Sequence, residues 1–239
     1  MQLKKTKLVL IKFFVYNNIV LYIMRILVMV MSCNQHSSLW DEIINRRRKD
    51  TYIFTGGSET TYMDKKNHVL HLKCNDKYDG LPEKVITMID YVLHNDHFSD
   101  VTHILKVDDH DTGFNKENIK NLYKIPDVQY GDYIGQKLHF FDFGKRAESK
   151  YHFRKVEKNS YWHNKPYTIT NNLNWLDGGS SYILSRKAAE IINNNCNPVI
   201  FHANKINESE IYEDVMIAKI LYNNDIHPKK VHYGFIGDK

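Results

Sequence analysis

Cysteine is scarce in this sequence and follows no recognisable pattern. The 239 residues include three cysteines, Cys33, Cys74 and Cys196, with no CxxC spacing. Because three thiols cannot all pair with one another, the sequence argues against a disulfide scaffold and against a structural zinc site. We expect buried free thiols. No HExxH or comparable histidine spacing occurs either, so nothing indicates a metalloprotease.

Dense runs of like charge are also missing. Lysine and arginine number 33 against 28 aspartates and glutamates, and the formal net charge is +5. The basic residues are scattered apart from Arg46–Lys49, which we interpret as a solvated helix end. That clustering is too weak for a nucleic-acid groove, so we expect no nucleic-acid partner. The mild positive charge suits a small anionic substrate such as a nucleotide.

An uninterrupted apolar run of membrane-spanning length is absent. Residues 1–23 are largely apolar, but polar residues such as Lys12 and Asn17 interrupt them. A spanning helix needs about 20 mostly apolar residues, and a charge near its centre costs roughly 2.5–3.5 kcal/mol. We treat residues 1–23 as an apolar N-terminal extension or a weak membrane anchor. An extra strand or helix, or a segment upstream of a working start at Met24, are the alternatives.

Residues 24–239 are long enough to bury one substantial core. Neither a low-complexity linker nor an internal repeat divides them, so we assign them to a single domain. The compact length and the lack of a convincing stem or signal segment favour a cytoplasmic location, in a microbe or a virus-infected host cell. A Golgi-type membrane-anchored enzyme is the less favoured alternative.

Strand and helix patterns alternate over the first half of the chain. Alternating apolar or β-branched residues predict strands at 25–33, 51–57, 67–74 and 102–107. Helical spacing predicts helices at 37–50 and 81–96, the second with Pro82 in its first turn. This alternation predicts an α/β fold with a mostly parallel central sheet flanked by helices.

The second half is less regular. Residues 130–143 contain strand-like runs that are compatible with a hairpin, and 145–167 form a polar segment that we interpret as a flexible loop near the functional site. Residues 174–195 predict a glycine turn, a short strand and a helix that begins at Arg186 with Ser185 as its cap. Residues 209–224 predict another helix.

An acidic cluster follows the strand predicted at 102–107. Asp108, Asp109 and Asp111 lie within four residues. Ligands gather at the carboxyl ends of strands in parallel sheets, and hard divalent cations prefer oxygen ligands. The cluster therefore suits a divalent ion that also binds a diphosphate, while the alternative is a solvated loop whose aspartates cap a turn.

Two further motifs have both a functional and a structural interpretation. Glu213 and Asp214 open a helix, where acidic residues are common because they complement the helix dipole. Gly178 and Gly179 follow Trp175, and paired glycines allow a ligand to approach the backbone while an aromatic face suits a sugar ring. The alternative is an ordinary turn beside a buried tryptophan.

Taken in order, these segments resemble the β-1,3-galactosyltransferase-like (Fringe-like) family of inverting, nucleotide-sugar-dependent glycosyltransferases. The likeness spans roughly residues 25 to 235 and rests on five motifs in the family's order. These motifs are "LWDEII…TYIFTGG", "CNDKYDGLPEKV", "ILKVDDHD", "WLDGGSSYILS" and "YEDVMIAKILYNNDIHP". Each motif is loose by itself, but five in the right order are specific.

The resemblance implies a GT-A-like fold, a UDP-sugar donor and Mn²⁺ or Mg²⁺ as cofactor. Asp108 and Asp109 match the first two aspartates of the family's Lys-x-Asp-Asp-Asp signature, His110 stands at the third position, and Asp111 follows. Either Asp109 and Asp111 hold the metal, which we favour, or His110 itself is the ligand. The resemblance also suggests His232 as a distant second ligand.

The same resemblance assigns roles to individual residues. Asp214 is expected to be the general base that removes the proton from an acceptor hydroxyl. Trp175 is expected to stack on the acceptor, and Ser181 replaces a glycine of the family. The residues expected to bind the donor are Lys106, Asp108, Asp109, Gly178, Gly179, Tyr182 and Glu213.

The function that follows is transfer of a hexose or N-acetylhexosamine from a nucleotide-diphosphate sugar to a hydroxyl of a glycan or glycoprotein. The resemblance implies inversion at the anomeric carbon and a β-1,3 linkage. Two alternatives come from other functional classes. One is a nucleotide-sugar- or glycan-binding protein that has the fold without the catalysis, suggested by His110. The other is a metal-dependent phosphoesterase.

Overall fold

The computed structural model describes residues 24–46, 50–110, 115–140, 147–169, 173–196 and 205–233. The predicted N-terminal extension, residues 1–23, and the predicted metal ligand Asp111 lie outside these ranges. No helix in the described ranges is long and apolar enough to cross a membrane.

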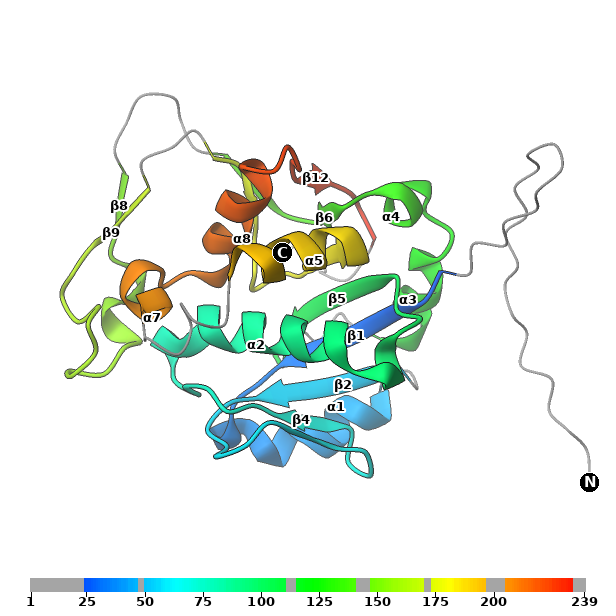
Figure 1. The fold of residues 1–239 in the computed structure, drawn as a ribbon, viewed down its shortest axis with the longest axis horizontal. Helices are drawn as coiled ribbons and strands as arrows, with labels where there is room; N and C mark the ends of the chain where they lie inside the picture. The colour runs from blue at the N-terminus through cyan, green and yellow to red at the C-terminus, as the bar shows by residue number, and fades with distance from the viewer. Residues whose placement is uncertain are drawn as a thin grey trace, which may run out of the picture.

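An eight-stranded mixed sheet forms the centre of the molecule (Figure 1). Its strands lie in the order β12 (Lys229–Lys230), β6 (Tyr133–Gly135), β11 (Tyr182–Ser185), β5 (His103–Asp108), β1 (Ile26–Met31), β2 (Thr51–Thr55), β4 (Val69–His71) and β3 (Tyr62–Asp64). Strands β5, β1, β2 and β4 pair in parallel, as do β12 and β6, whereas β11 runs antiparallel to β5 and β6, and β3 runs antiparallel to β4. The predicted mostly parallel central sheet is therefore confirmed.

Helices cover both faces of this sheet, and strand β1 shows why. All six of its residues are buried. Alternate side chains belong to separate apolar clusters: Leu27 and Met29 lie in one, and Val28 and Val30 lie in the other. A strand buried on both faces needs a helical layer on each side. One layer consists of α2 (Leu81–His94), α5 (Arg186–Asn195) and α8 (Glu213–Tyr222), and the other of α1 (Trp40–Arg46), α3 (Lys116–Leu122) and α4 (Pro126–Tyr130) (Figure 1).

The predicted helix boundaries follow the capping signals. Pro82 lies in the first turn of α2, and the Ser185 side chain accepts a hydrogen bond from the Ala188 backbone N–H at the start of α5. The predicted helix at 37–50 begins as a 3₁₀ helix, η1 (Asn34–Leu39), and becomes α-helical at Trp40. The remaining short helices are η2 (Tyr78–Gly80), η3 (Asp96–Phe98), η4 (Tyr151–Arg154) and α7 (Lys205–Ser209).

The hairpin suggested for residues 130–143 is wrong. Strand β6 pairs with β11 and β12, while β7 (Leu138–His139) pairs with β10 (Trp175–Leu176). All three residues of β6 are buried, whereas both residues of β7 are half-buried. A strand inside the sheet needs partners on both edges, and β11 and β12 supply them.

The polar segment 145–167 contains more order than the predicted loop. Strands β8 (Ala147–Ser149) and β9 (Tyr167–Ile169) pair antiparallel, and η4 follows β8. His152 and Trp162, which belong to this segment, are buried. Of the three cysteines, only Cys196 is buried. Cys33 and Cys74 are half-buried, and all three are free thiols.

Candidate active site

Two adjoining cavities lie at the carboxyl end of β5. Their volumes are about 650 Å³ and about 710 Å³. We name them the Asp214 cavity and the Asp76 cavity, each after an acid in its wall. The lining of both includes Asp108 and His110, so the acidic end of β5 lies where the two cavities meet.

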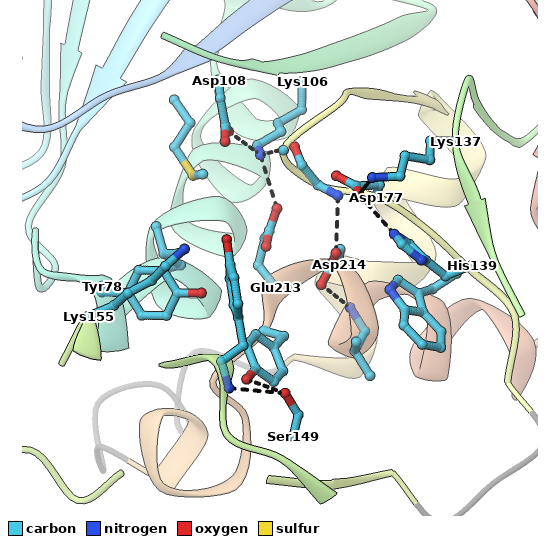
Figure 2. A pocket seen from close by; sticks show the side chains of 18 of the residues that line it. Tyr78, Lys106, Asp108, Lys137, His139, Ser149, Lys155, Asp177, Glu213 and Asp214 are labelled. Atoms are coloured by element: carbon cyan, nitrogen blue, oxygen red, sulfur yellow. Dashed lines mark hydrogen bonds and ion pairs between the residues drawn. The ribbon is translucent and has the colours of Figure 1, made fainter. Parts of the chain in front are cut away.

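Lys106 links three segments around the Asp214 cavity (Figure 2). Its side chain on β5 is fully buried, and its Nζ lies 2.6 Å from Asp108 Oδ1 and 3.0 Å from Glu213 Oε1. It also donates to the Gly178 carbonyl oxygen at 2.7 Å. Burial alone would lower the pKa of Lys106, but the two carboxylates outweigh it and raise the pKa. The buried ammonium is thus charged and paired, as a buried charge must be.

Gly178 is required by the same arrangement. A Cβ at this position would lie 2.3 Å from Glu213 Oε1, so a side chain would displace the carboxylate that Lys106 holds. The Gly178 backbone N–H also donates to Asp214 Oδ2 at 3.1 Å. The glycine therefore allows the turn and the N-terminus of α8 to approach closely.

Asp214 faces the cavity with both carboxylate oxygens oriented. Oδ2 accepts from Gly178, and Oδ1 accepts from the Val215 backbone N–H at 2.8 Å. Burial and the neighbouring Glu213 raise the pKa of Asp214 to about 7, although the two N–H groups and Lys106 act in the opposite direction. A carboxylate with a pKa near neutrality is suited to accept a proton.

Asp109 faces the Asp76 cavity and is held by residues that follow β1. Ser32 Oγ donates to Asp109 Oδ2 at 2.7 Å, and His36 Nδ1 lies 2.7 Å from the same oxygen. Burial raises the pKa of Asp109, but the hydrogen bonds with His110, Ser32 and His36 outweigh it and hold the pKa far below its ordinary value. Asp109 is therefore an ionised, fixed carboxylate.

Asp76 and Lys84 form a second buried lysine site. Lys84 Nζ lies 2.7 Å from Asp76 Oδ1 and donates to the Ser32 carbonyl oxygen at 3.0 Å. The backbone N–H groups of Asn34 and Gly56 also donate to Asp76, each at 2.8 Å. Burial raises the pKa of Asp76, but Lys84 and these N–H groups outweigh it and lower the pKa.

A third polar group lies on the far side of Asp214 from Tyr78 (Figure 2). Asp177 Oδ2 lies 2.8 Å from both Lys137 Nζ and His139 Nε2. The imidazole of His139 stacks on Trp175 with ring centroids 5.2 Å apart. All four side chains line the Asp214 cavity.

The structure brings most of the predicted site residues together. The Asp214 cavity is lined by Lys106, Asp108, His110, Gly178, Gly179, Glu213 and Asp214, and the Asp76 cavity by Asp108, Asp109 and His110. Tyr182 is fully buried in β11 instead, with its ring centroid 5.6 Å from Lys106 Nζ. His232 is exposed and is absent from both linings, so its assignment as a metal ligand stays a prediction.

Sequence reasoning missed the residues that fix Asp109 and Asp76. Met31 at the end of β1 lies opposite Asp108 in the parallel register, so Ser32 comes beside Asp109. The sequence prediction placed Ser32 inside the strand at 25–33 and gave His36 no role, so it contained no signal that either residue contacts Asp109. Lys84 lies in a segment that the family resemblance covers, but its burial depends on tertiary packing.

The donor set at the end of β5 suits a hard divalent cation. Asp108 and Asp109 have carboxylate oxygens, the ligand type that Mn²⁺ and Mg²⁺ prefer, whereas the imidazole of His110 is more typical of softer metals. In the ranges that the structure describes, no group of three or more His, Cys, Asp or Glu is arranged to hold a metal ion. Asp111, the other predicted ligand, lies outside those ranges.

Two solved structures match the chain weakly and at low sequence identity. One is a cytidylyltransferase from Leptospira borgpetersenii serovar Hardjo-bovis (strain JB197), with 8% identity and a TM-score of 0.43 over 88% of this chain and 78% of that chain. Another is 4-diphosphocytidyl-2C-methyl-D-erythritolsynthase from Anaerococcus prevotii DSM 20548, with 6% identity and a TM-score of 0.40 over 89% of each chain. A search of curated proteins gave no match.

A family model gives the more specific comparison. The model described as Galactosyltransferase matches residues 58–232, which is most of the chain and includes β5, the glycine turn and α8. The α/β sheet flanked by helices fits the GT-A-like fold that the resemblance implied. The chain therefore belongs to the galactosyltransferase family.

Proposed function

We propose that this protein is an inverting glycosyltransferase in which Asp214 is the general base. It would move a hexose or N-acetylhexosamine from a UDP sugar to a hydroxyl of a glycan or glycoprotein and form a β-1,3 linkage. The observation that carries the proposal is the placement of Asp214. Its carboxylate is held by two backbone N–H groups in a cavity wall, with a pKa raised to about 7.

In the proposed reaction, Asp214 takes the proton of the acceptor hydroxyl while that oxygen bonds to the anomeric carbon. The bond from the anomeric carbon to the donor phosphate oxygen breaks on the opposite face, so the electron pair leaves with the nucleotide diphosphate. Attack from that face inverts the configuration. A positioned general base typically contributes about 10²–10⁴-fold, and the fixed orientation of the reactants adds to it.

The residues around Asp214 would bind the two substrates. Lys106, Glu213 and the Gly178–Gly179 turn would shape the donor sugar site, beneath which Tyr182 is packed. Trp175, whose ring stacks on His139, would present an aromatic surface to the acceptor. The Asp76 cavity adjoins the proposed sugar site and would hold the nucleoside.

The acidic end of β5 would hold Mn²⁺ or Mg²⁺. Asp109 and Asp111 are the favoured ligands, with Asp108 and His110 beside them and His232 as a more distant candidate. When bound, the ion would offset the negative charge that develops on the departing diphosphate.

The test combines a donor screen with one substitution. Thermal shifts are measured with each nucleotide sugar, with and without Mn²⁺, and transfer is then measured with the donor that stabilises the protein most. Asp214→Asn should still bind the donor and should lose transfer by about 10²–10⁴-fold. Asp41→Asn, which removes an exposed acid from α1, is the control for lost charge.

Each alternative function has its own outcome in this test. Normal turnover by Asp214→Asn would remove Asp214 from the base role. Metal-dependent donor binding without turnover by the wild-type protein would indicate a nucleotide-sugar- or glycan-binding protein. Cleavage of the donor to free sugar, with no acceptor preference, would indicate a phosphoesterase.

A further inference from the structure

One segment of the polar region contributes residues to the lining of both cavities. We call residues 149–157 the strap. At one end, Ser149 Oγ and His152 Nδ1 lie 2.8 Å and 2.7 Å from Tyr212 Oη. Tyr212 is the residue directly before α8. At the other end Glu157 pairs with Lys77 Nζ at 2.5 Å, in the loop before α2. The strap therefore connects the wall that carries Asp214 with the wall that carries Asp76.

Lys155 lies on the strap and lines both cavities. Its ammonium lies 3.6 Å from the centroid of the Tyr151 ring and 5.0 Å from that of Tyr78. Figure 2 shows Lys155 beside Tyr78, with Glu213 between it and Asp214. The two rings fix the ammonium by cation–π attraction, but they carry no charge to neutralise it.

The other lysines that line the cavities are each paired with a carboxylate. Lys77 pairs with Glu157, Lys84 with Asp76, Lys106 with Asp108 and Glu213, and Lys137 with Asp177. Within the described ranges, no carboxylate lies within ion-pair distance of Lys155. Its positive charge is therefore available to an anion at the junction of the cavities.

A nucleotide sugar would present an anion at this junction. In the proposed function the nucleoside occupies the Asp76 cavity and the sugar lies beside Asp214, so the diphosphate between them must pass the residues common to both linings. These include Asp108, His110, Tyr78 and Lys155. Lysine is a common phosphate ligand because its ammonium acts as a compact point charge.

We propose that Lys155 binds the diphosphate of the donor and stabilises the nucleotide diphosphate as it leaves. This inference rests on the proposed function and adds a residue to it. The strap thereby contributes a positive charge to the site from outside the sheet, on the side away from Asp177 and Lys137.

The test compares UDP with uridine, which lacks the phosphates. Dissociation constants are measured with Mn²⁺ present, by calorimetry for UDP and by a ligand-observed NMR titration for uridine. Lys155→Met should weaken UDP binding by about tenfold to a hundredfold and leave uridine binding unchanged, because only a charge-assisted contact to phosphate is removed. Lys155→Arg keeps the charge and should keep UDP binding within a few-fold of wild type.

Lys165→Met is the matched control. Lys165 also belongs to the polar region and contacts aromatic rings, with its Nζ 3.6 Å from the Tyr161 ring centroid, but it lines neither cavity. Its substitution should leave both affinities unchanged. An equal loss of UDP and uridine binding in Lys155→Met would overturn the inference, because it would indicate a structural effect.

The result also separates this inference from the proposed function. If the wild-type protein binds UDP and Lys155→Met binds it equally well, only the role of Lys155 is wrong. If the wild-type protein binds neither UDP nor uridine, the donor assignment is wrong and the inference falls with it.

Discussion

The two cavities contain the same pair of residue types, a buried lysine and an aspartate, but each uses them differently. Beside the Asp76 cavity, Lys84 pairs with Asp76 itself, and the pKa of that acid is lowered. Beside the Asp214 cavity, Lys106 pairs with the neighbours of Asp214, and the pKa of Asp214 is raised. A buried lysine thus fixes an acid as an anion when it pairs with it directly. When it pairs with the acid's neighbours, the acid can still take up a proton.

This difference suits the walls of the two cavities to separate roles. Asp76 accepts hydrogen bonds from Asn34 and Gly56, so its fixed negative charge joins the segments after β1 and β2. Among the described residues, Asp214 accepts hydrogen bonds from the backbone N–H groups of Gly178 and Val215, and in the proposed function it would take the proton of the acceptor hydroxyl. Asp76 is therefore suited to hold the cavity wall in place, and Asp214 is suited to accept a proton.

The largest expected effect in this comparison is loss of stability when a lysine is removed. Lys106→Met leaves the buried carboxylate of Glu213 without its partner, and breaking such a pair costs about 3–5 kcal/mol. Lys84→Met should cost less, about 1–3 kcal/mol, because Asp76 keeps its bonds from Asn34 and Gly56. Urea unfolding of both variants measures the difference.

A second substitution tests the reason for that difference. Lys106→Met combined with Glu213→Gln removes the unpaired charge and should recover part of the lost free energy of unfolding. Equal losses from the two single lysine variants, or no recovery in the double variant, would contradict the asymmetry.

The next effect is a dependence of stability on pH with opposite sign at the two acids. Because the pKa of Asp214 is raised from 3.8 to about 7, its charging destabilises the folded protein as pH rises across that interval. The Tm of Asp214→Asn minus that of wild type should therefore increase from pH 4 to pH 7 and then level off. The transfer rate of the wild type should rise over the upper part of the same range, as the base form appears.

Asp76 should behave in the opposite way. Its pKa lies below 3.8, so the ionised carboxylate stabilises the fold above that pH, and the stabilisation is lost as pH falls through the lowered pKa. Asp76→Asn should be destabilised at pH 7, with a deficit that shrinks in acid. Asp41→Asn controls for the loss of an exposed charge. Parallel pH curves for Asp76→Asn and Asp214→Asn would show that the two acids do not differ as described.

Much of the fold could be predicted because local signals and burial agree. The strand at β1 has buried side chains on both faces, and the cap at Ser185 is set by its own hydroxyl. The hairpin predicted from residues 130–143 is wrong because strand partners depend on which edges remain open in the finished sheet. The apolar pattern of residues 130–143 indicates that strands are present but not which strands they pair with.

The site could be predicted where a motif lies within one segment. The resemblance of two such motifs to a known family led to the prediction that Asp214 and Gly178 belong to the site, and the structure brings them within hydrogen-bond distance. Ser32 and Lys155 could not be found, because their importance depends on strand register and on the path of the strap. Single-sequence patterns contain neither, since both arise from contacts between distant segments.

The smallest expected effect on stability concerns the backbone angle φ of Ser181, and Gly57 beside the other cavity provides the comparison. Near Asp76 a positive φ of 79° is taken by Gly57, whereas Ser181, after the glycine turn, has a φ of 137°. A non-glycine residue in such a conformation costs roughly 1–3 kcal/mol, while the bond from Ser181 Oγ to Tyr233 Oη at 3.2 Å returns about 1 kcal/mol. Ser181→Gly should therefore raise the free energy of unfolding by about 1 kcal/mol.

Matched alanine substitutions decide whether backbone strain is the cause. Ser181→Ala keeps the strain and loses the bond to Tyr233, so it should lower the free energy of unfolding by about 1 kcal/mol. Gly57→Ala introduces the same kind of strain near Asp76 and should lower it by about 1–3 kcal/mol. If Ser181→Gly and Ser181→Ala were equally destabilised in urea, the hydroxyl alone would matter and the backbone at Ser181 would not be strained.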